Sequence, residues 1–253
     1  MDQVDDRRRV AFVTGAAAGI GAAIALAFAR QGWDLALSST RPERLADTAD
    51  KARAAGAQVL ALALDQSAIG QIERAVAQVF ERYPQLDALV CNAGVTSRKP
   101  ALEVDAADWD ALMQVNVRGT FFLCQQVGRR WIERARPGCI VTLASAHGVV
   151  GFANRSLYGT SKAAIMQMTR LLAIEWAQHG IRANAVAPGT VDTPSREAAF
   201  ADPAVRKPML DRIPLHRFAT MDEVAQAVCF LAGPHAGYVT GQTLLLDGGL
   251  TAQ

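Results

Sequence analysis

The chain has 253 residues, of which 51% are hydrophobic and 20% are charged, the ordinary composition of a globular protein. Its formal net charge is only +2, and its basic residues are scattered, which argues against a nucleic-acid-binding surface. We therefore expect residues 1–253 to form a single domain with one sizeable core and no nucleic-acid partner.

No pattern in the sequence predicts export, a membrane span or a metal site. The first apolar run, residues 10–13, is too short for a secretory signal, and no stretch approaches the ~20 apolar residues of a span. The four cysteines form no CxxC pair, and the four histidines lack metal-ligand spacing. We expect a cytoplasmic protein with reduced thiols, no membrane contact and no bound metal.

Apolar runs of strand length alternate with longer amphipathic stretches along nearly the whole chain. The runs are continuous rather than alternating, as at residues 89–91, which is typical of strands covered on both faces in a parallel sheet. The predicted strands are residues 10–14, 34–39, 58–64, 86–92, 138–144, 181–187 and 243–246. This order predicts an α/β fold, a doubly wound Rossmann-type sheet of about seven strands flanked by helices, which binds ligands at the carboxyl ends of its strands.

The first predicted strand leads directly into a glycine-rich turn and then an alanine-rich helix. A dinucleotide pyrophosphate must approach backbone N–H groups at a helix N-terminus, where the helix dipole favours anions. Only glycines or very small residues leave room for it. An ordinary tight connection can also contain glycines, but the strand before and the helix after favour a nucleotide site. The Gly-x3-Gly-x-Gly spacing places this site at Gly15, Ala18, Gly19, Ile20 and Gly21.

The second predicted strand ends at Ser39, followed by Thr40 and Arg41. NAD-specific sites place a carboxylate here to bind the ribose 2′-hydroxyl. This chain has no carboxylate at these positions to repel a 2′-phosphate, and Arg41 can pair with that group. The alternative is that Arg41 lies in a solvated loop. We therefore predict NADP(H) as the cofactor, with NAD(H) as the alternative.

Residues 194–214 depart from the alternation of strands and helices. Four prolines stand among charged residues in this stretch: Pro194, Pro203, Pro208 and Pro214. A long loop in a compact domain is more often a lid or binding loop than a plain connector. We therefore predict that residues 194–214 form a loop that covers the substrate.

Three residues with reactive side chains follow the fifth predicted strand. Tyr158 and Lys162 are four apart, so on a helix they lie one turn apart on the same face. A phenol, with an ordinary pKa of ~10, is a poor base near neutrality, and a nearby lysine cation lowers that pKa by favouring the phenolate. Ser145, at the strand end, can donate a hydrogen bond to a substrate oxygen. A Tyr-x3-Lys pair alone is often a surface pair, but all three together predict a catalytic site.

These motifs resemble those of the short-chain dehydrogenase/reductase family, and the resemblance covers residues 8–250. It rests on the glycine turn, residues 92–94, Asn116, Ser145, Tyr158 with Lys162, Pro188-Gly189 with Thr193, and the closing stretch 238–249. The sequence departs from the family where Cys91 replaces a frequent second asparagine and His216 replaces a frequent glycine.

The resemblance implies an oxidoreductase that transfers a hydride between a nicotinamide cofactor and a secondary alcohol or ketone. It implies a catalytic tetrad of Asn116, Ser145, Tyr158 and Lys162, in which Tyr158 transfers the proton, Asn116 holds a water-linked proton relay and Lys162 also binds the nicotinamide ribose. Besides Tyr158 and Lys162, the further cofactor-binding residues it implies are Asp65 and Asn92 on the adenosine side, Ala93, Gly94, and Pro188, Gly189, Val191 and Thr193 over the nicotinamide.

Two other classes of function compete with this interpretation. A nucleotide-binding sensor or methyltransferase-like domain needs the glycine turn but not Ser145, Tyr158 and Lys162, and an inactive relative would lack a member of the tetrad. The tetrad is complete, which favours an active enzyme.

The substrate is predicted from the residues beside the tetrad, which are all polar: Arg98, His147, Asn154 and Arg155. They favour a small polar substrate such as a sugar or a sugar acid, whose carboxylate Arg98 and Arg155 would bind. The alternative, from similarity to that group of enzymes, is a 3-oxoacyl-[acyl-carrier-protein] reductase of fatty-acid synthesis.

Two helical stretches, residues 108–134 and 158–179, carry more apolar residues than one buried face needs. These residues are Trp109, Met113, Val117, Phe121 and Phe122 in the first, and Met166, Met168, Leu171, Leu172 and Trp176 in the second. Exposed apolar faces usually mark an interface, although burial within one subunit is the alternative. Because the family resemblance implies pairing through these helices, we predict a homotetramer.

Overall fold

The computed structural model describes residues 7–196 and 201–252. They contain one parallel sheet with the strand order β3-β2-β1-β4-β5-β6-β7. Its strands are β1 (Val10–Thr14), β2 (Asp34–Ser39), β3 (Val59–Ala63), β4 (Ala88–Cys91), β5 (Gly138–Leu143), β6 (Ile181–Pro188) and β7 (Thr243–Leu246). The predicted doubly wound sheet is confirmed, and the strand order reverses between β1 and β4, where such folds bind their ligands.

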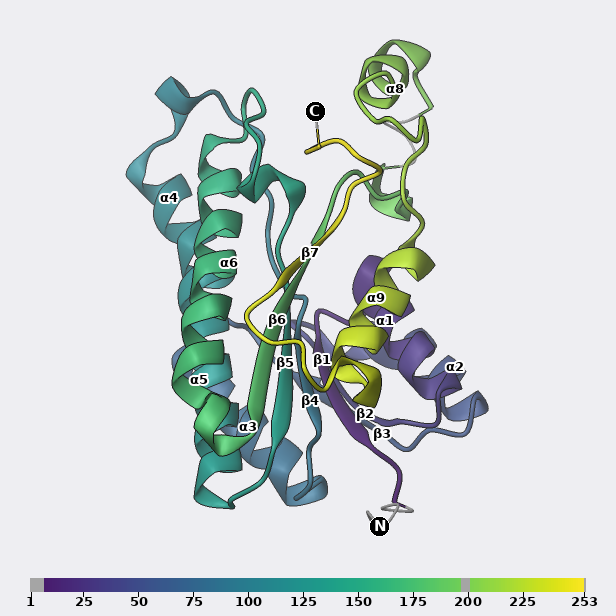
Figure 1. Cartoon of the computed structure of the whole chain (residues 1–253), viewed down its shortest axis with the longest axis vertical. Coiled ribbons are helices and arrows are strands. Elements are labelled where there is room, and N and C mark those ends of the chain that lie inside the picture. Colours follow the sequence, from purple (N-terminus) through teal and green to yellow (C-terminus); the bar gives the residue numbers. More distant parts are fainter. Residues whose placement is uncertain (1–6, 197–200, 253) are drawn as a thin grey trace.

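Helices cover both faces of the sheet (Figure 1). On one face lie α3 (Ile69–Arg82), α4 (Ala106–Met113), α5 (Thr120–Glu133) and α6 (Ser156–Trp176), and on the other lie α1 (Gly19–Arg30), α2 (Ala46–Ala54) and α9 (Met221–Ala232). Among the described residues, no helix combines the length and apolar character needed to cross a bilayer.

Each face of the sheet buries its own apolar core, because successive residues of a strand point to opposite faces. Phe12, Leu89 and Ile140 belong to the core on the side of α3, α5 and α6. Their neighbours Val13 and Val141 belong to the core on the side of α1, α2 and α9. Both sets are buried, which explains why the strands are apolar without alternation.

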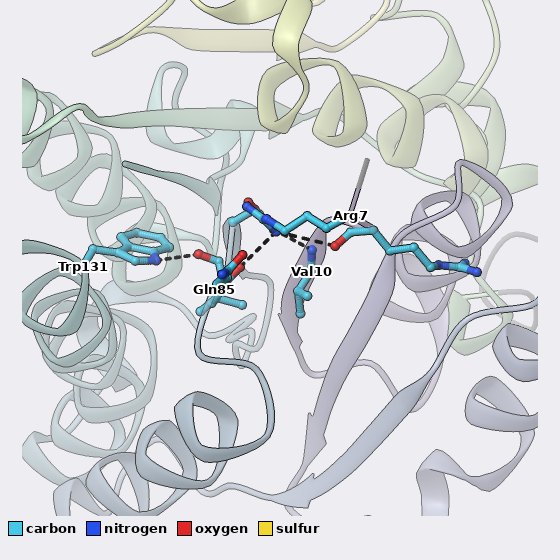
Figure 2. A network of polar contacts seen from close by, with 7 residues as sticks. Arg7, Val10, Gln85 and Trp131 are labelled. Atoms are coloured by element: carbon cyan, nitrogen blue, oxygen red, sulfur yellow. Dashed lines mark hydrogen bonds and ion pairs between the residues drawn. The ribbon is translucent and has the colours of Figure 1, made fainter. Parts of the chain in front are cut away.

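Polar contacts hold together the end of the sheet where β1 and β4 begin (Figure 2). The carboxylate of Asp87 accepts hydrogen bonds from Val10 N and from Arg7 Nη1, each at 2.8 Å. Trp131 of α5 donates through Nε1 to the carbonyl of Leu86 at 2.7 Å. β4 itself begins at Ala88, two residues later than predicted. These contacts fix the end of the sheet opposite the glycine turn.

The segment predicted as a substrate-covering loop, residues 194–214, is partly helical. It contains a short 3-10 turn at Pro194–Arg196 and the helix α8 (Pro203–Leu210), while residues 197–200 lie outside the described residues. Asp202 caps α8 by accepting a hydrogen bond from Ala204 N at 2.8 Å, and Pro203 suits the first helical position because its fixed φ fits the helix. The prediction of a loop throughout is therefore wrong for residues 203–210. Figure 1 shows α8 at the end of the molecule opposite the N-terminus.

The apolar residues of α5 and α6 divide between core and surface. Met166, Met168 and Leu172 are buried, contrary to the prediction that they belong to an exposed face, although Met168 and Leu172 also border the groove described below. Phe121 is 39% exposed and Leu171 is 49% exposed. The exposed residues line a groove of about 1070 Å³ between the α4–α5 stretch and α6.

Candidate active site

The glycine turn after β1 takes a shape that other residues cannot adopt without strain. Gly15 and Gly19 have left-handed backbone conformations, with φ of 65° and 60°. A Cβ at Gly21 would lie 2.2 Å from the carbonyl oxygen of Gly15, whereas no atom lies within 4 Å of a Cβ placed at Gly19. Ala18 is the residue before α1, and its side chain makes no capping hydrogen bond, so the first backbone amides of α1 adjoin the open space beside Gly19. Ile20 continues the first turn of α1. The turn thus fits a dinucleotide pyrophosphate.

Asn92 and Thr14 hold the turn in place. Asn92 Nδ2 donates to the carbonyls of Thr14 at 2.9 Å and Gly15 at 3.1 Å. Thr14 Oγ1 accepts hydrogen bonds from the backbone amides of Asn92 and Ala93 at 3.2 and 3.1 Å. Asn92, predicted on the adenosine side, therefore also braces the turn. The sequence reasoning missed Thr14 as a site residue, although it opens the glycine motif.

The residues predicted on the adenosine side follow the carboxyl ends of β2 and β3. Ser39 Oγ accepts a hydrogen bond from the backbone N of Arg41 at 3.3 Å, and Arg41 is exposed. Asp65 Oδ1 accepts from the backbone N and the hydroxyl of Ser67, at 2.9 and 2.7 Å. The hydroxyl of Ser38 is buried and has no hydrogen-bond partner among the described residues. These ends share one edge of the sheet with the glycine turn, because β1, β2 and β3 are parallel neighbours.

Asn116 lies in a π-helical turn, Gln114–Gly119, which joins α4 to α5. Its Oδ1 accepts from Val95 N at 2.8 Å, and its Nδ2 donates to Val95 O at 2.9 Å and to Ser161 Oγ at 3.1 Å. Turns of this kind are frequent at functional sites. A Cβ at Gly94 would lie 3.1 Å from Asn116 Oδ1 and 3.7 Å from Lys162 Nζ, so the two side chains meet at Gly94. Sequence reasoning missed the π turn and Ser161.

Lys162 is buried on α6, and its Nζ donates to the carbonyl of Leu143 at 2.6 Å. Burial lowers the pKa of this amine from 10.5 to about 8. The same nitrogen lies 5.7 Å from the ring centroid of Tyr158. The structure thus brings the amine and the phenol ring together on one face of α6, as their spacing predicts.

Ser145 follows β5, and α6 packs tightly on the turn that it opens. Ser145 Oγ accepts from His147 N at 3.2 Å and donates to Pro188 O at 3.5 Å. The approach of α6 requires glycine, because a Cβ at Gly159 would lie 2.7 Å from the carbonyl oxygen of His147. This packing sets the ring of Tyr158 edge-on against His147, with centroids 5.7 Å apart.

The segment predicted to cover the nicotinamide, Pro188–Thr193, continues from β6 beside Ser145. Gly189 N donates to Leu246 O at 2.9 Å, and a Cβ at Gly189 would lie 2.9 Å from the Cα of Asp247. Val191 is buried and pairs with Ala219. Thr193 Oγ1 lies 3.2 Å from Ser195 Oγ. The segment is therefore held to β7 and to the chain leading into α9.

The four predicted substrate residues lie at unequal distances from the tetrad. His147 touches Tyr158, and the guanidinium carbon of Arg155 lies 5.9 Å from the Tyr158 ring centroid. Arg155 also donates to Thr96 Oγ1 at 2.9 Å and to Ser97 O at 2.8 Å, so it braces the loop after β4. Arg98 and Asn154 are exposed, and Asn154 has a left-handed φ of 62°.

Two residues of this region, Phe152 and Arg212, carry no sequence motif and were missed. The Phe152 ring packs against His147 with centroids 4.3 Å apart, and the guanidinium carbon of Arg212 lies 4.4 Å from the Phe152 ring centroid. Only the folded chain brings Arg212, more than fifty residues later in the sequence, to Phe152.

Comparison with known proteins places this geometry among nicotinamide-dependent enzymes. Residues 15–251 match the family model described as "Enoyl-(Acyl carrier protein) reductase". The chain is 38% identical to glucose 1-dehydrogenase of Gluconobacter oxydans, covering 94% of this chain and 90% of the relative. It is also 38% identical to the 3-oxoacyl-[acyl-carrier-protein] reductase of Thermotoga maritima, covering 96% and 97%.

Solved structures agree over nearly the whole length. A Sinorhizobium meliloti protein described as a short-chain alcohol dehydrogenase superposes with a TM-score of 0.93 at 36% identity, covering 99% of this chain and all of that one. An Agrobacterium tumefaciens protein described as a 2-deoxy-D-gluconate 3-dehydrogenase, with NADP bound, has a TM-score of 0.91 at 33% identity, with both chains fully covered.

Proposed function

The chain belongs to the short-chain dehydrogenase/reductase family, as an NAD(P)-dependent oxidoreductase acting on CH–OH groups, and we propose that it interconverts a small polar secondary alcohol and its ketone with NADP(H). The substrate class that we propose is a sugar or sugar acid. The observation that carries the proposal is that Tyr158 lies beside Lys162 and is connected through His147 to Ser145, in a chain whose glycine turn is shaped for a dinucleotide.

The residues of this chain divide the chemistry among them. The nicotinamide, when bound, accepts or supplies the hydride. During reduction, Tyr158 Oη donates its proton to the carbonyl oxygen, and the hydroxyl of Ser145 turns its one hydrogen from Pro188 O to the same oxygen. Lys162 Nζ donates one of its three N–H hydrogens to Leu143 O. Its two remaining hydrogens bind the ribose hydroxyls. Asn116, fixed between Val95 and Ser161, holds the water of the proton relay.

The residues on the adenosine side support NADP(H). Ser39 and Arg41 follow β2 where NAD-specific sites place a carboxylate, and Arg41 is exposed at this edge. A guanidinium there can pair with a 2′-phosphate. The Agrobacterium tumefaciens relative was solved with NADP bound.

The second candidate is reduction of a 3-oxoacyl group on carrier protein. It is supported by the Thermotoga maritima relative, and the description of the matching family model shares with it only the acyl carrier protein. The polar residues near Tyr158, His147 and Arg155, favour a small hydroxylated substrate instead.

Steady-state turnover with both cofactors separates these candidates. We expect NADP(H)-dependent turnover of sugars, sugar acids or polyols, and little with 3-oxoacyl thioesters. Activity with acyl thioesters alone would replace the proposed substrate class with the second candidate.

We also propose that the enzyme is a cytoplasmic homotetramer. The groove lined by Met113, Val117, Phe121, Leu171 and Trp176 supports the assembly, because a second copy of the same helices would bury it. The segment around α8 is proposed to cover the substrate, since it follows directly from Pro188–Thr193 beside the tetrad.

A further inference from the structure

Three aromatic rings, those of Tyr158, His147 and Phe152, form a row of successive contacts that begins at the tetrad. His147 packs edge-on against Tyr158 with centroids 5.7 Å apart, and Phe152 packs edge-on against His147 at 4.3 Å. The backbone N–H of His147 also donates to Ser145 Oγ at 3.2 Å. This aromatic row therefore starts at the two groups that would hold the reacting oxygen.

The far end of the aromatic row carries a positive charge from a distant part of the chain. Arg212 follows α8, and its guanidinium carbon lies 4.4 Å from the ring centroid of Phe152. The contact is favourable because the face of an aromatic ring is electron-rich. Arg212 is exposed, so a small molecule can reach it from solvent.

The planar guanidinium of arginine is suited to bidentate binding of a carboxylate. Two ring-to-ring contacts link Tyr158 to the Phe152 ring on which Arg212 stacks. This chain of contacts places Arg212 at the border of the site that would hold the reacting oxygen.

We propose that Arg212 is a specificity-determining residue, whose guanidinium binds the carboxylate of a hydroxy or keto acid. This inference rests on the proposed function and names the substrate class within it. Arg82 provides a matched control, because it is exposed at the end of α3, outside the segment around α8, and its guanidinium carbon lies 4.8 Å from the ring centroid of Tyr83.

The test compares wild type with Arg212→Gln, Arg212→Lys and Arg82→Gln. The substrates are sugar acids and hydroxycyclohexanecarboxylates, each beside the neutral compound in which a hydroxymethyl group replaces the carboxylate. We expect Arg212→Gln to raise KM for the acids by about 10- to 100-fold, the effect of losing a hydrogen bond to a charged group, and to leave the neutral compounds unchanged. Arg212→Lys retains the charge without the two parallel N–H donors and gives a smaller increase in KM, while Arg82→Gln matches wild type.

Two results would overturn the role of Arg212 while leaving the proposed function intact. One is equal turnover of acids and neutral compounds by the wild type, and the other is an equal loss for both kinds of substrate in Arg212→Gln. Turnover of acyl thioesters alone, by contrast, would overturn the proposed function itself, and the inference with it.

Discussion

Lys162 illustrates at the residue scale how the fold changes the chemistry of a side chain. Burial lowers the pKa of its amine from 10.5 to about 8. Between these values the unfolded chain binds the proton more strongly than the folded protein, so this group makes the free energy of unfolding rise with pH. Below about 8 both states are protonated, and the contribution is constant.

We therefore expect wild type to gain stability relative to Lys162→Met as the pH rises from about 8 to 10.5. The measurement is urea unfolding of both proteins at the two ends of this range. The comparison cancels the titration of other groups, including the buried thiols of Cys139 and Cys229, whose pKa values burial raises. Parallel pH profiles for the two proteins would show that the amine is not buried.

Arg41 tests the choice of cofactor. If its guanidinium pairs with the 2′-phosphate, Arg41→Ala lowers kcat/KM for NADPH by about 10- to 100-fold and leaves NADH nearly unchanged. The matched control is Arg44→Ala, because Arg44 is also exposed and lies in the turn Pro42–Leu45 that follows Arg41. A wild-type preference for NADH would contradict the assignment, whatever the variants do.

Residue types were easier to predict than residue contacts. The glycine turn, Ser145 and the Tyr158–Lys162 pair were predicted from spacing and from the carboxyl ends of parallel strands, which meet at one edge, whereas Asn116 was predicted only from the family resemblance. By contrast, the bonds of Asn92 to the turn and of Arg155 to the loop after β4 depend on chain segments about sixty to eighty residues apart. No local pattern in the sequence reports such contacts.

At the scale of elements, the position of α6 decides whether the tetrad forms. A Cβ at Gly159 would lie 2.7 Å from the backbone oxygen of His147, so alanine there must displace the start of α6 and the ring of Tyr158. We expect Gly159→Ala to cost about 1–3 kcal/mol in unfolding free energy and to lower kcat by up to about 100-fold.

The control is Gly70→Ala on α3, where a Cβ would lie 3.7 Å from Arg74 Nη1, an ordinary contact. This substitution should change the unfolding free energy by no more than about 1 kcal/mol and leave kcat unchanged. Thermal unfolding and steady-state kinetics on both variants provide the measurement. Equal changes in unfolding free energy and kcat for Gly159→Ala and Gly70→Ala would show that the position of α6 does not depend on the close contact at Gly159.

Strands were predicted better than irregular elements. Continuous apolar runs place the strands correctly, but their ends extend too far because Leu64 and Leu86 are buried without lying in a strand. The helix α8 was read as loop because Pro203 and Pro208 are usually breakers, although Pro203 fits the first helical turn. The π turn around Asn116 depends on packing and leaves no periodic signal.

At the scale of the whole molecule, the exposed groove between α5 and α6 tests the assembly. We expect light scattering to give about four times the 27.0 kDa of one chain. Leu171→Glu, in the groove, should lower this mass, whereas Leu102→Glu, at a fully exposed leucine outside the groove lining, should not. A wild-type mass of one chain would contradict the homotetramer.

Proton transfer by Tyr158 is the central claim, and single-turnover kinetics of Tyr158→Phe test it most directly. The variant keeps the ring that packs on His147 and loses only the hydroxyl. The assay uses saturating cofactor and a ketone that the wild type reduces. We expect the rate of hydride transfer to fall by about 10²- to 10⁴-fold, the usual contribution of a positioned acid or base. The dissociation constant of the cofactor, measured by fluorescence on the same samples, should stay within about twofold of wild type, because the loss lies in the transition state. A Tyr158→Phe protein that transfers hydride at nearly the wild-type rate would contradict the assignment.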